Sequence, residues 1–162
     1  MKVVTDASPL NYLVLIDAEH VLPELFREVL VPPEVVQELG YPRTPAKVCA
    51  WISTPPPWLR ATLSSRGLPD EKLSPGESAA IALAIDAGAD ALLIDERDGT
   101  GAARRLGINT VGTLAVLVIA AEKGLLSLER AIAALRATSF RATPSLLNAL
   151  LALDKQRSTH CG

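Results

Sequence analysis

The stretch from Ser74 to Gly107 constrains the fold more than any other part of the sequence. Ser74 can cap a helix, Pro75 suits its first position and Glu77 stands three residues after the cap, which predicts a helix that begins with a capping box. The short apolar run 91–94 follows, bounded by acids, and predicts a buried strand. The stretch therefore predicts a helix–strand unit of a parallel sheet with acidic residues after the strand.

The same alternation runs through most of the chain. Short β-branched or apolar runs predict strands at 2–5, 29–31, 58–61, 91–94 and 107–112. Helix-start residues and helical periodicity predict helices at 8–16, 20–26, 32–39, 45–52, 74–87, 100–106, 113–123, 128–137 and 144–153. Alternating strands and helices predict an α/β fold with a mainly parallel sheet covered on both faces. Right-handed crossovers then bring the carboxyl ends of the strands to one edge.

Length and composition limit the number of domains and the class of protein that the chain can form. A chain of 162 residues predicts a single domain, 1–153, followed by a polar and flexible tail, 154–162. The longest apolar run, Leu114–Ala121, is far shorter than the ~20 residues of a membrane span. Residues 1–10 contain no long apolar segment followed by a small-residue cleavage site, as an export signal would. We therefore expect a cytoplasmic protein. The net charge of −2 argues against a basic face over the whole domain but leaves a nucleic-acid partner open.

Asp6 and Asp95 each follow a predicted strand and are the first candidates for a functional site. Asp is common in turns, so either residue could merely end its strand. A carboxylate next to a buried strand is costly unless a partner compensates its charge, which favours a functional role for Asp6. We expect Ser8 to cap the helix that begins there and to hydrogen-bond Asp6.

Two further acids have simple structural explanations. Glu77 completes a capping box with Ser74 and needs no other role on spacing alone. Gly76 beside it would let another group approach closely. Glu38 is an ordinary helix carboxylate by its sequence position, and only closeness to Asp6 would single it out.

Glu96 and Asp98 follow Asp95 directly, and spacing does not choose between them. Asp98 can cap the next helix, while Glu96 can face water. Residues 98–100, Asp-Gly-Thr, also resemble part of the aspartyl-phosphate motif of haloacid dehalogenase-like phosphatases. Those enzymes carry the nucleophile two residues before the Asp of the motif, where this chain has Glu96. A phosphohydrolase is therefore the weakest of the functional hypotheses.

Taken together, these segments resemble the PIN-domain family, and in particular the branch related to VapC-type ribonuclease toxins. The matching segments, in order, are Val3–Leu10, Val31–Leu39, Gly76–Ala84, Leu92–Arg97 and Gly107–Thr113. The match runs from about residue 3 to residue 140. The resemblance implies a three-layer α/β/α sandwich with a central parallel sheet and a ribonuclease site that binds a divalent metal ion.

The resemblance also implies the site residues. The family's acids fall on Asp6, Glu38, Glu77 and Asp95, which become the candidate catalytic residues. The candidate metal ligands are Asp6, Glu77, Asp95 and Asp98, with Glu96 as the alternative to Asp98, and Ser8, Glu96 and Thr113 are candidate supporting residues. Mg²⁺ or Mn²⁺ suits such a set because both ions prefer oxygen ligands. The ion would lower the pKa of a bound water that attacks the phosphodiester.

The expected function is therefore a Mg²⁺- or Mn²⁺-dependent endoribonuclease, the toxin component of a toxin–antitoxin pair. The expected partners are an RNA substrate, a small antitoxin protein and a second copy of the chain, with no membrane involved. The alternative is a PIN-fold module that binds RNA or protein and cleaves weakly or not at all. It arises because 98–101 stands where relatives of this branch often carry basic residues.

Overall fold

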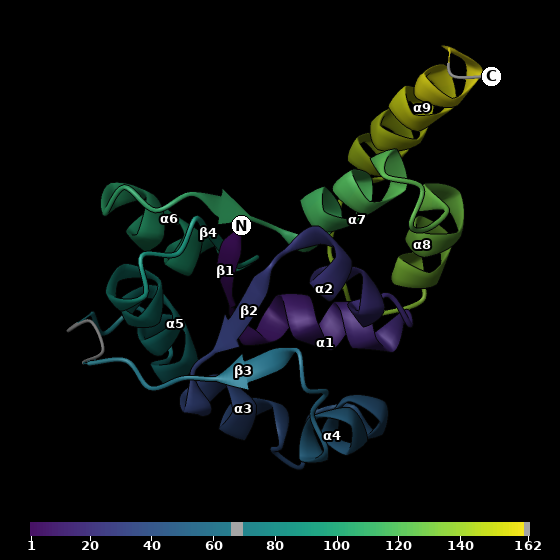
Figure 1. Cartoon of the computed structure of the whole chain (residues 1–162). Helices are drawn as coiled ribbons and strands as arrows, with labels where there is room; N and C mark the ends of the chain where they lie inside the picture. The colour runs from purple at the N-terminus through teal and green to yellow at the C-terminus, as the bar shows by residue number, and fades with distance from the viewer. Residues whose placement is uncertain (66–69, 161–162) are drawn as a thin grey trace. The chain divides into compact units, whose positions relative to one another are not determined.

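The computed structural model describes residues 1–65 and 70–160 and contains two compact units, 1–113 and 114–162. The first unit holds a parallel sheet with the strand order β3-β2-β1-β4-β5 (Figure 1). The strands are β1 (Lys2–Thr5), β2 (Glu28–Val31), β3 (Leu59–Ala61), β4 (Ala91–Leu93) and β5 (Thr110–Val111). The prediction of a mainly parallel sheet is confirmed, and β3, which was predicted at 58–61, lies at its edge.

Register brings the ends of β1 and β4 together. Thr5 of β1 pairs with Leu93 of β4, and the next amide, that of Asp6, donates a hydrogen bond to the Leu93 carbonyl over 2.9 Å. Since the two strands are parallel neighbours, the residues that follow them emerge at the same edge of the sheet.

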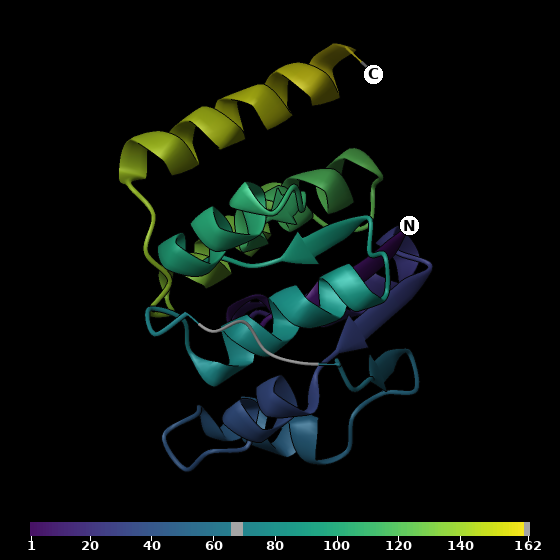
Figure 2. The same cartoon turned by 90° about the vertical axis from the view of Figure 1, so that its left-hand side faces the viewer.

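Helices alternate with the strands of the first unit. They are α1 (Ala7–Leu15), the 3₁₀ turn η1 (Glu19–Val21), α2 (Leu22–Leu25), α3 (Pro33–Leu39), α4 (Ala46–Ser53), α5 (Pro75–Asp86) and α6 (Arg97–Arg105). In Figure 2, α5 crosses the sheet beside β4. Val4 faces α5, while Val3 and Thr5 point to the opposite face and are also fully buried. Both faces are therefore covered, and the predicted three-layer α/β/α sandwich is confirmed.

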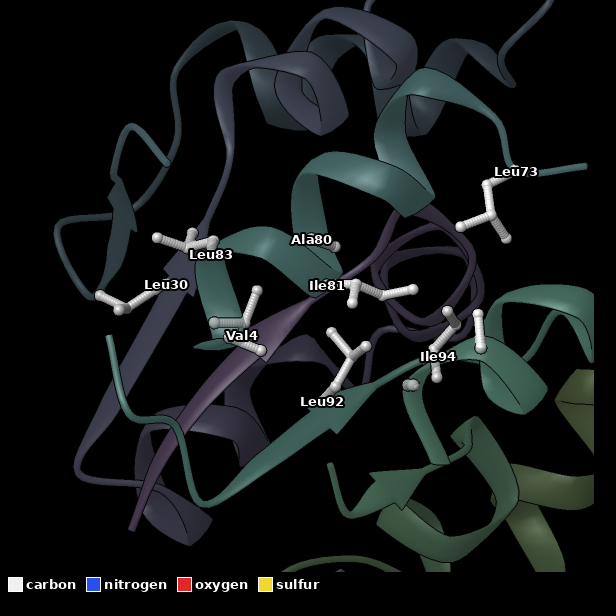
Figure 3. Close-up of a cluster of buried hydrophobic side chains, with 11 residues drawn as sticks. Val4, Leu30, Leu73, Ala80, Ile81, Leu83, Leu92 and Ile94 are labelled. Atoms are coloured by element: carbon white, nitrogen blue, oxygen red, sulfur yellow. The ribbon is translucent and has the colours of Figure 1, made fainter. Parts of the chain in front are cut away.

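A cluster of buried hydrophobic side chains lies between α5 and the sheet (Figure 3). Ile81 of α5 packs near Leu92 of β4 and Val4 of β1, and each of these side chains is fully buried. Burial of an aliphatic side chain of this size contributes roughly 1.5–3 kcal/mol. Residues 79–84 are buried all round the helix, whereas Ile85 near its end is 51% exposed. This packing fixes where the first turn of α5 lies.

Two helix starts differ from the sequence prediction. Helix α1 begins at Ala7 with Asp6 at its N-cap position, so Ser8 is not the cap. Pro9 is tolerated there because the first-turn amides of a helix lack partners within the helix. Helix α6 begins at Arg97, three residues earlier than expected, because the Thr100 amide already bonds the Glu96 carbonyl over 2.9 Å. Asp98 is therefore a first-turn residue and not a cap.

The second unit consists of α7, which begins at the last residue of the first unit (Thr113–Glu122), α8 (Leu128–Arg136) and α9 (Pro144–His160). The prediction that the last helix ends at Leu153 was wrong. Arg157 binds the Asp154 carboxylate over 2.6 Å and the Ala121 carbonyl over 3.2 Å, which stabilises the additional turns. The single-domain boundary and the flexibility of 154–162 stay predictions. None of the helices in 1–65 and 70–160 combines the length and hydrophobicity that a bilayer crossing requires.

Candidate functional site

Four predicted acids converge on the carboxyl edge of the sheet. They come from separate elements, with Asp6 after β1, Glu38 on α3, Glu77 on α5 and Asp95 after β4. Asp6 is almost fully buried, at 2% exposure, while Glu38, Glu77 and Asp95 are half-buried. The site therefore lies where open parallel sheets place their binding crevices.

Gly76 is the point at which α3 and α5 approach each other. A Cβ atom at this position would lie 2.5 Å from Glu38 Oε2 and 3.8 Å from Asp6 Oδ1. The carboxylates of Glu38 and Asp6 thus meet over the same piece of backbone, and only glycine leaves room for them. The spatial link that would single out Glu38 is present.

One carboxylate oxygen of Glu77 caps the start of α5, and the other has no hydrogen-bond partner. Its Oε1 accepts a hydrogen bond from the Ser74 amide over 3.3 Å, and Ser74 Oγ accepts one from the Glu77 amide over 3.1 Å. The capping box is therefore confirmed. Glu77 Oε2 points toward α6, where a Cβ atom at Gly99 would lie 2.6 Å away. The capping box therefore involves only one of the two carboxylate oxygens of Glu77.

Asp95 is held by two hydroxyl side chains. Thr113 donates from its amide to Asp95 Oδ1 over 2.8 Å and from its hydroxyl to Asp95 Oδ2 over 2.6 Å. Ser8 donates to Asp95 Oδ2 over 3.2 Å. The expected bond from Ser8 to Asp6 is therefore wrong in its acceptor, because the start of α1 at Ala7 directs Ser8 toward the neighbouring strand end. Ser8 and Thr113 fix Asp95 in one orientation.

The pKa of Asp6 reflects its burial and the acidic side chains around it. Burial, together with the neighbouring carboxylates of Glu77, Glu38 and Glu96, raises the pKa of Asp6 from its usual 3.8 to about 7. A hydrogen bond with the Ala7 amide acts against this rise. Without a cation, Asp6 therefore holds a proton up to about neutral pH.

Glu38 responds in the same way to its surroundings. Burial raises its pKa, and the carboxylates of Glu77 and Glu96 add to this rise, while the Arg43 guanidinium lowers it. Glu96 thus contributes to the field at both acids. The choice between Glu96 and Asp98 as a further acid of the site stays open, and both side chains are exposed.

Two buried carboxylate oxygens in this site have no hydrogen-bond partner, Asp6 Oδ1 and Glu77 Oε2. Buried oxygens of this kind are normally satisfied, so they indicate a missing positive group. Mg²⁺ or Mn²⁺ fits because the available donors are all oxygens and the acids repel one another. In the part of the chain that the structure describes, no three His, Cys, Asp or Glu side chains form a finished metal cage. The donor types therefore fit the ion.

Asp98 lies in a different setting from the other acids. It lines a cavity of about 560 Å³ together with Asp95 and a group of basic residues, Lys72, Arg97, Arg104 and Arg105. The predicted helix start at Thr100 left Arg97 outside the helix that carries Arg104 and Arg105. A start at Arg97 puts Arg97 and Arg104, seven residues apart, on one helix face.

Comparisons with known proteins place the chain among relatives. A family model described as a PIN domain matches residues 2–156. A PilT N-terminus domain protein from the hyperthermophilic archaeon Sulfolobus solfataricus P2 is similar in structure, with 14% sequence identity over 88% of this chain and 100% of that one and a TM-score of 0.48. No curated protein matches the chain.

Proposed function

The chain belongs to the PIN-domain family, whose members are generally nucleases, and we propose on this basis that it is a metal-dependent endoribonuclease. The proposed catalytic acids are Asp6, Glu38, Glu77 and Asp95. The single observation that supports this site most directly is the pair of buried, unpartnered oxygens on Asp6 and Glu77. A buried carboxylate oxygen is normally hydrogen-bonded, whereas a ligand for a cation need not be. Glu19 Oε2 in η1 is unpartnered as well, so what distinguishes Asp6 and Glu77 is that they also act on each other as neighbouring acids.

Each side chain has a role that follows from its contacts. Asp6, Glu77 and Asp95 would hold the ion, and Ser8 and Thr113 keep Asp95 oriented for it. The bound cation would supply a water of lowered pKa and would stabilise negative charge on the phosphate. Glu38, half-buried and close to Asp6, would accept a hydrogen bond from the attacking water at Oε2.

A cleavage assay with matched variants tests this proposal. We expect the full chain to cut single-stranded RNA with Mn²⁺ or Mg²⁺ and EDTA to abolish cutting. Asp6→Asn and Asp95→Asn should each lower the rate by roughly 100-fold or more. Glu34→Gln, an exposed carboxyl on the same helix as Glu38, is the control and should cut like the unmodified chain. Intact RNA in both metals, or full activity of Asp6→Asn, would rule the proposal out.

We further propose that the chain is the toxin of a toxin–antitoxin pair, with a small antitoxin and a second copy of itself as protein partners. Exposed apolar side chains on α9, such as Leu146 and Leu153 at 46% and 62% exposure, support a protein contact. Expression of the chain should arrest growth, and co-expression of the protein from a neighbouring small reading frame should restore it. Light scattering would give the mass of the assembly. Normal growth with active enzyme would exclude the toxin role and leave the nuclease proposal intact.

A further inference from the structure

A second cavity adjoins the acid cluster and shares no lining residue with the basic one described above. We call it the Tyr12 cavity. It has a volume of about 200 Å³, lies between α1, α3 and the turn from α3 to α4, and is lined by Ala7, Ser8, Asn11, Tyr12, Glu38, Leu39 and Thr44. Two of these residues contact or neighbour the other acids. Ser8 donates to Asp95 Oδ2 over 3.2 Å, and Glu38 Oε2 meets Asp6 Oδ1 over Gly76. A group in this cavity would therefore lie beside the proposed site.

One wall of the Tyr12 cavity is a single face of α1. Its four residues on this helix are spaced three and four apart, which places them side by side. Asn11 and Tyr12 are both half-buried. The side-chain amide of Asn11 forms no hydrogen bond with any other residue that the structure describes. Its donor and its acceptor are therefore both available to a ligand.

The opposite wall is held in place by the turn from α3 to α4. Thr44 donates from its hydroxyl to the Glu38 carbonyl over 3.2 Å and from its amide to the Tyr41 carbonyl over 3.0 Å. Cys49 Sγ donates to the carbonyls of Tyr41 and Thr44 over 3.3 and 3.5 Å. The wall is thus formed before a ligand binds, which lowers the conformational entropy lost on binding.

The side chains that line the Tyr12 cavity suit a flat and uncharged group. None of them is a cation, and the one charged group, Glu38, would repel a phosphate in the cavity. An aromatic ring, aliphatic surface and a few neutral polar groups are the usual composition of a ligand pocket. The volume lies below the ~300–1,000 Å³ of sites that hold a whole ligand, so the cavity fits one part of a larger molecule. An unstacked RNA base is such a part, because proteins stack it on aromatic rings and hydrogen-bond its edge.

We propose that the Tyr12 cavity holds one nucleobase of a single-stranded RNA substrate, from a nucleotide next to the bond that is cut; this inference rests on the proposed nuclease function. Tyr12 would stack on the base, and the Asn11 amide would hydrogen-bond its edge. Because Glu38 belongs to the cavity and to the acid cluster, a base held here would position its own phosphate beside the acids. The cavity would therefore make cleavage depend on the base at one position.

The test measures base recognition separately from cleavage. The full chain is titrated in EDTA into a short fluorescent RNA, and into copies of it in which a single abasic nucleotide is moved along the strand. An abasic nucleotide keeps its ribose and phosphate, so a change in Kd reports the base alone. We expect the abasic nucleotide to raise Kd by about tenfold at one position, because a base stacked on an aromatic side chain contributes an effect of this size.

Variants of the cavity assign this effect to its residues. Asn11→Ala and Tyr12→Leu should each reduce the tenfold difference to about threefold or less. Tyr12→Phe should keep the difference, because it retains the ring and loses only the hydroxyl. Gln37→Ala is the control for Asn11→Ala, since it removes an exposed amide of α3 that does not line the cavity. Cut sites mapped on random-sequence RNA with Mn²⁺ should show a base preference that Asn11→Ala and Tyr12→Leu flatten.

The outcomes distinguish the cavity from the nuclease. A base-dependent Kd that Asn11→Ala and Tyr12→Leu abolish, without cleavage by the unmodified chain, would support the cavity and refute the nuclease. Cleavage with the same base dependence in both variants as in the unmodified chain would overturn the inference and leave the nuclease proposal intact. A Kd that is indifferent to every abasic position, or no RNA binding at all, would overturn it as well.

Discussion

Asp6 is the residue at which folding and the proposed chemistry conflict most strongly. It is 2% exposed, its Oδ1 has no hydrogen-bond partner, and three other carboxylates face it. A buried acid in such a field is tolerated only as the neutral form or with a cation beside it. The side chain therefore destabilises the metal-free protein at neutral pH, and it is retained at a place where an ion would remove the penalty.

The raised pKa of Asp6 predicts how stability depends on pH. Below about pH 4 the carboxyl is protonated in both the folded and the unfolded chain, so it contributes no dependence. Between its usual pKa of 3.8 and its folded pKa of about 7, the folded chain retains a proton that the unfolded chain has lost. The free energy of unfolding should therefore fall as pH rises through this window, by on the order of 4 kcal/mol for this group.

Urea unfolding in EDTA at pH 5 and pH 8 measures this effect. Asp6→Asn should remove most of the fall, because the amide does not titrate, whereas exposed Glu34→Gln should keep it. Glu38 acts in the same direction through its own raised pKa, so a smaller slope remains in Asp6→Asn. Equal slopes in Asp6→Asn and the unmodified chain would show that this carboxyl is not the source.

At the scale of elements, the close approach of α3 and α5 creates the site. The two helices are far apart in sequence and contact each other at Gly76, where Glu38 and Asp6 meet. Val35 of α3 lies 3.4 Å from the place of a Gly76 Cβ and packs the helices together. The absence of a side chain at one position thus determines how close two carboxylates come.

Gly76→Ala should separate activity from stability. A Cβ would lie 2.5 Å from Glu38 Oε2, the end of a flexible side chain, so Glu38 can move aside without unfolding either helix. Stability should change by less than about 1 kcal/mol, since alanine also favours the helix. Cleavage should fall by about tenfold or more, because the catalytic carboxyl is displaced.

Gly40→Ala is the control, because the nearest atom to its Cβ would be the Gln37 carbonyl oxygen at an ordinary 3.5 Å. It should retain activity. Thermal unfolding and the rate of RNA cleavage, measured on the same samples, check both halves of the prediction. A Gly76→Ala variant that cuts at the normal rate would show that Glu38 need not occupy its present position.

The helices and strands were predictable from local sequence patterns, whereas the contacts between them were not. The β-branched run of β1 and the Ser74–Glu77 capping box carry their own signals, and both elements form where expected. Helix starts at Ala7 and Arg97 were missed because Ser8 and Asp98 look like caps, while the backbone bonds that decide the start are not visible in sequence. Without the family resemblance, Glu38 would have remained an ordinary helix acid, since its closeness to Asp6 depends on tertiary packing.

At the scale of the molecule, the net charge of −2 conceals a separation of charges within the first unit. Acids collect where β1 and β4 end, and Lys72, Arg97, Arg104 and Arg105 line a cavity that also includes Asp95. A divalent cation and a polyanion could therefore bind next to each other. The net charge of the chain reveals neither the acidic nor the basic cluster. This arrangement explains how a slightly acidic chain could bind RNA.

Binding of a divalent ion should stabilise the whole folded chain. An ion present at 100 times its Kd adds about 2.7 kcal/mol to the free energy of unfolding if it binds only the folded state. We expect Mn²⁺ to raise Tm at pH 8, and Asp95→Asn to abolish most of the rise. Glu34→Gln should show the full rise. A Tm that is indifferent to Mn²⁺ and Mg²⁺ would indicate that these acids do not hold such an ion.

Glu77 shows what one extra methylene allows. Its Oε1 accepts a hydrogen bond from the Ser74 amide, while its Oε2 extends toward Gly99 and has no hydrogen-bond partner. An aspartate at this position would be too short to span from the amide to the ion and would have to serve one or the other. Glutamate lets the same carboxylate cap the beginning of α5 with one oxygen and offer the other as a ligand. The position of the ligand oxygen therefore depends on where the helix begins.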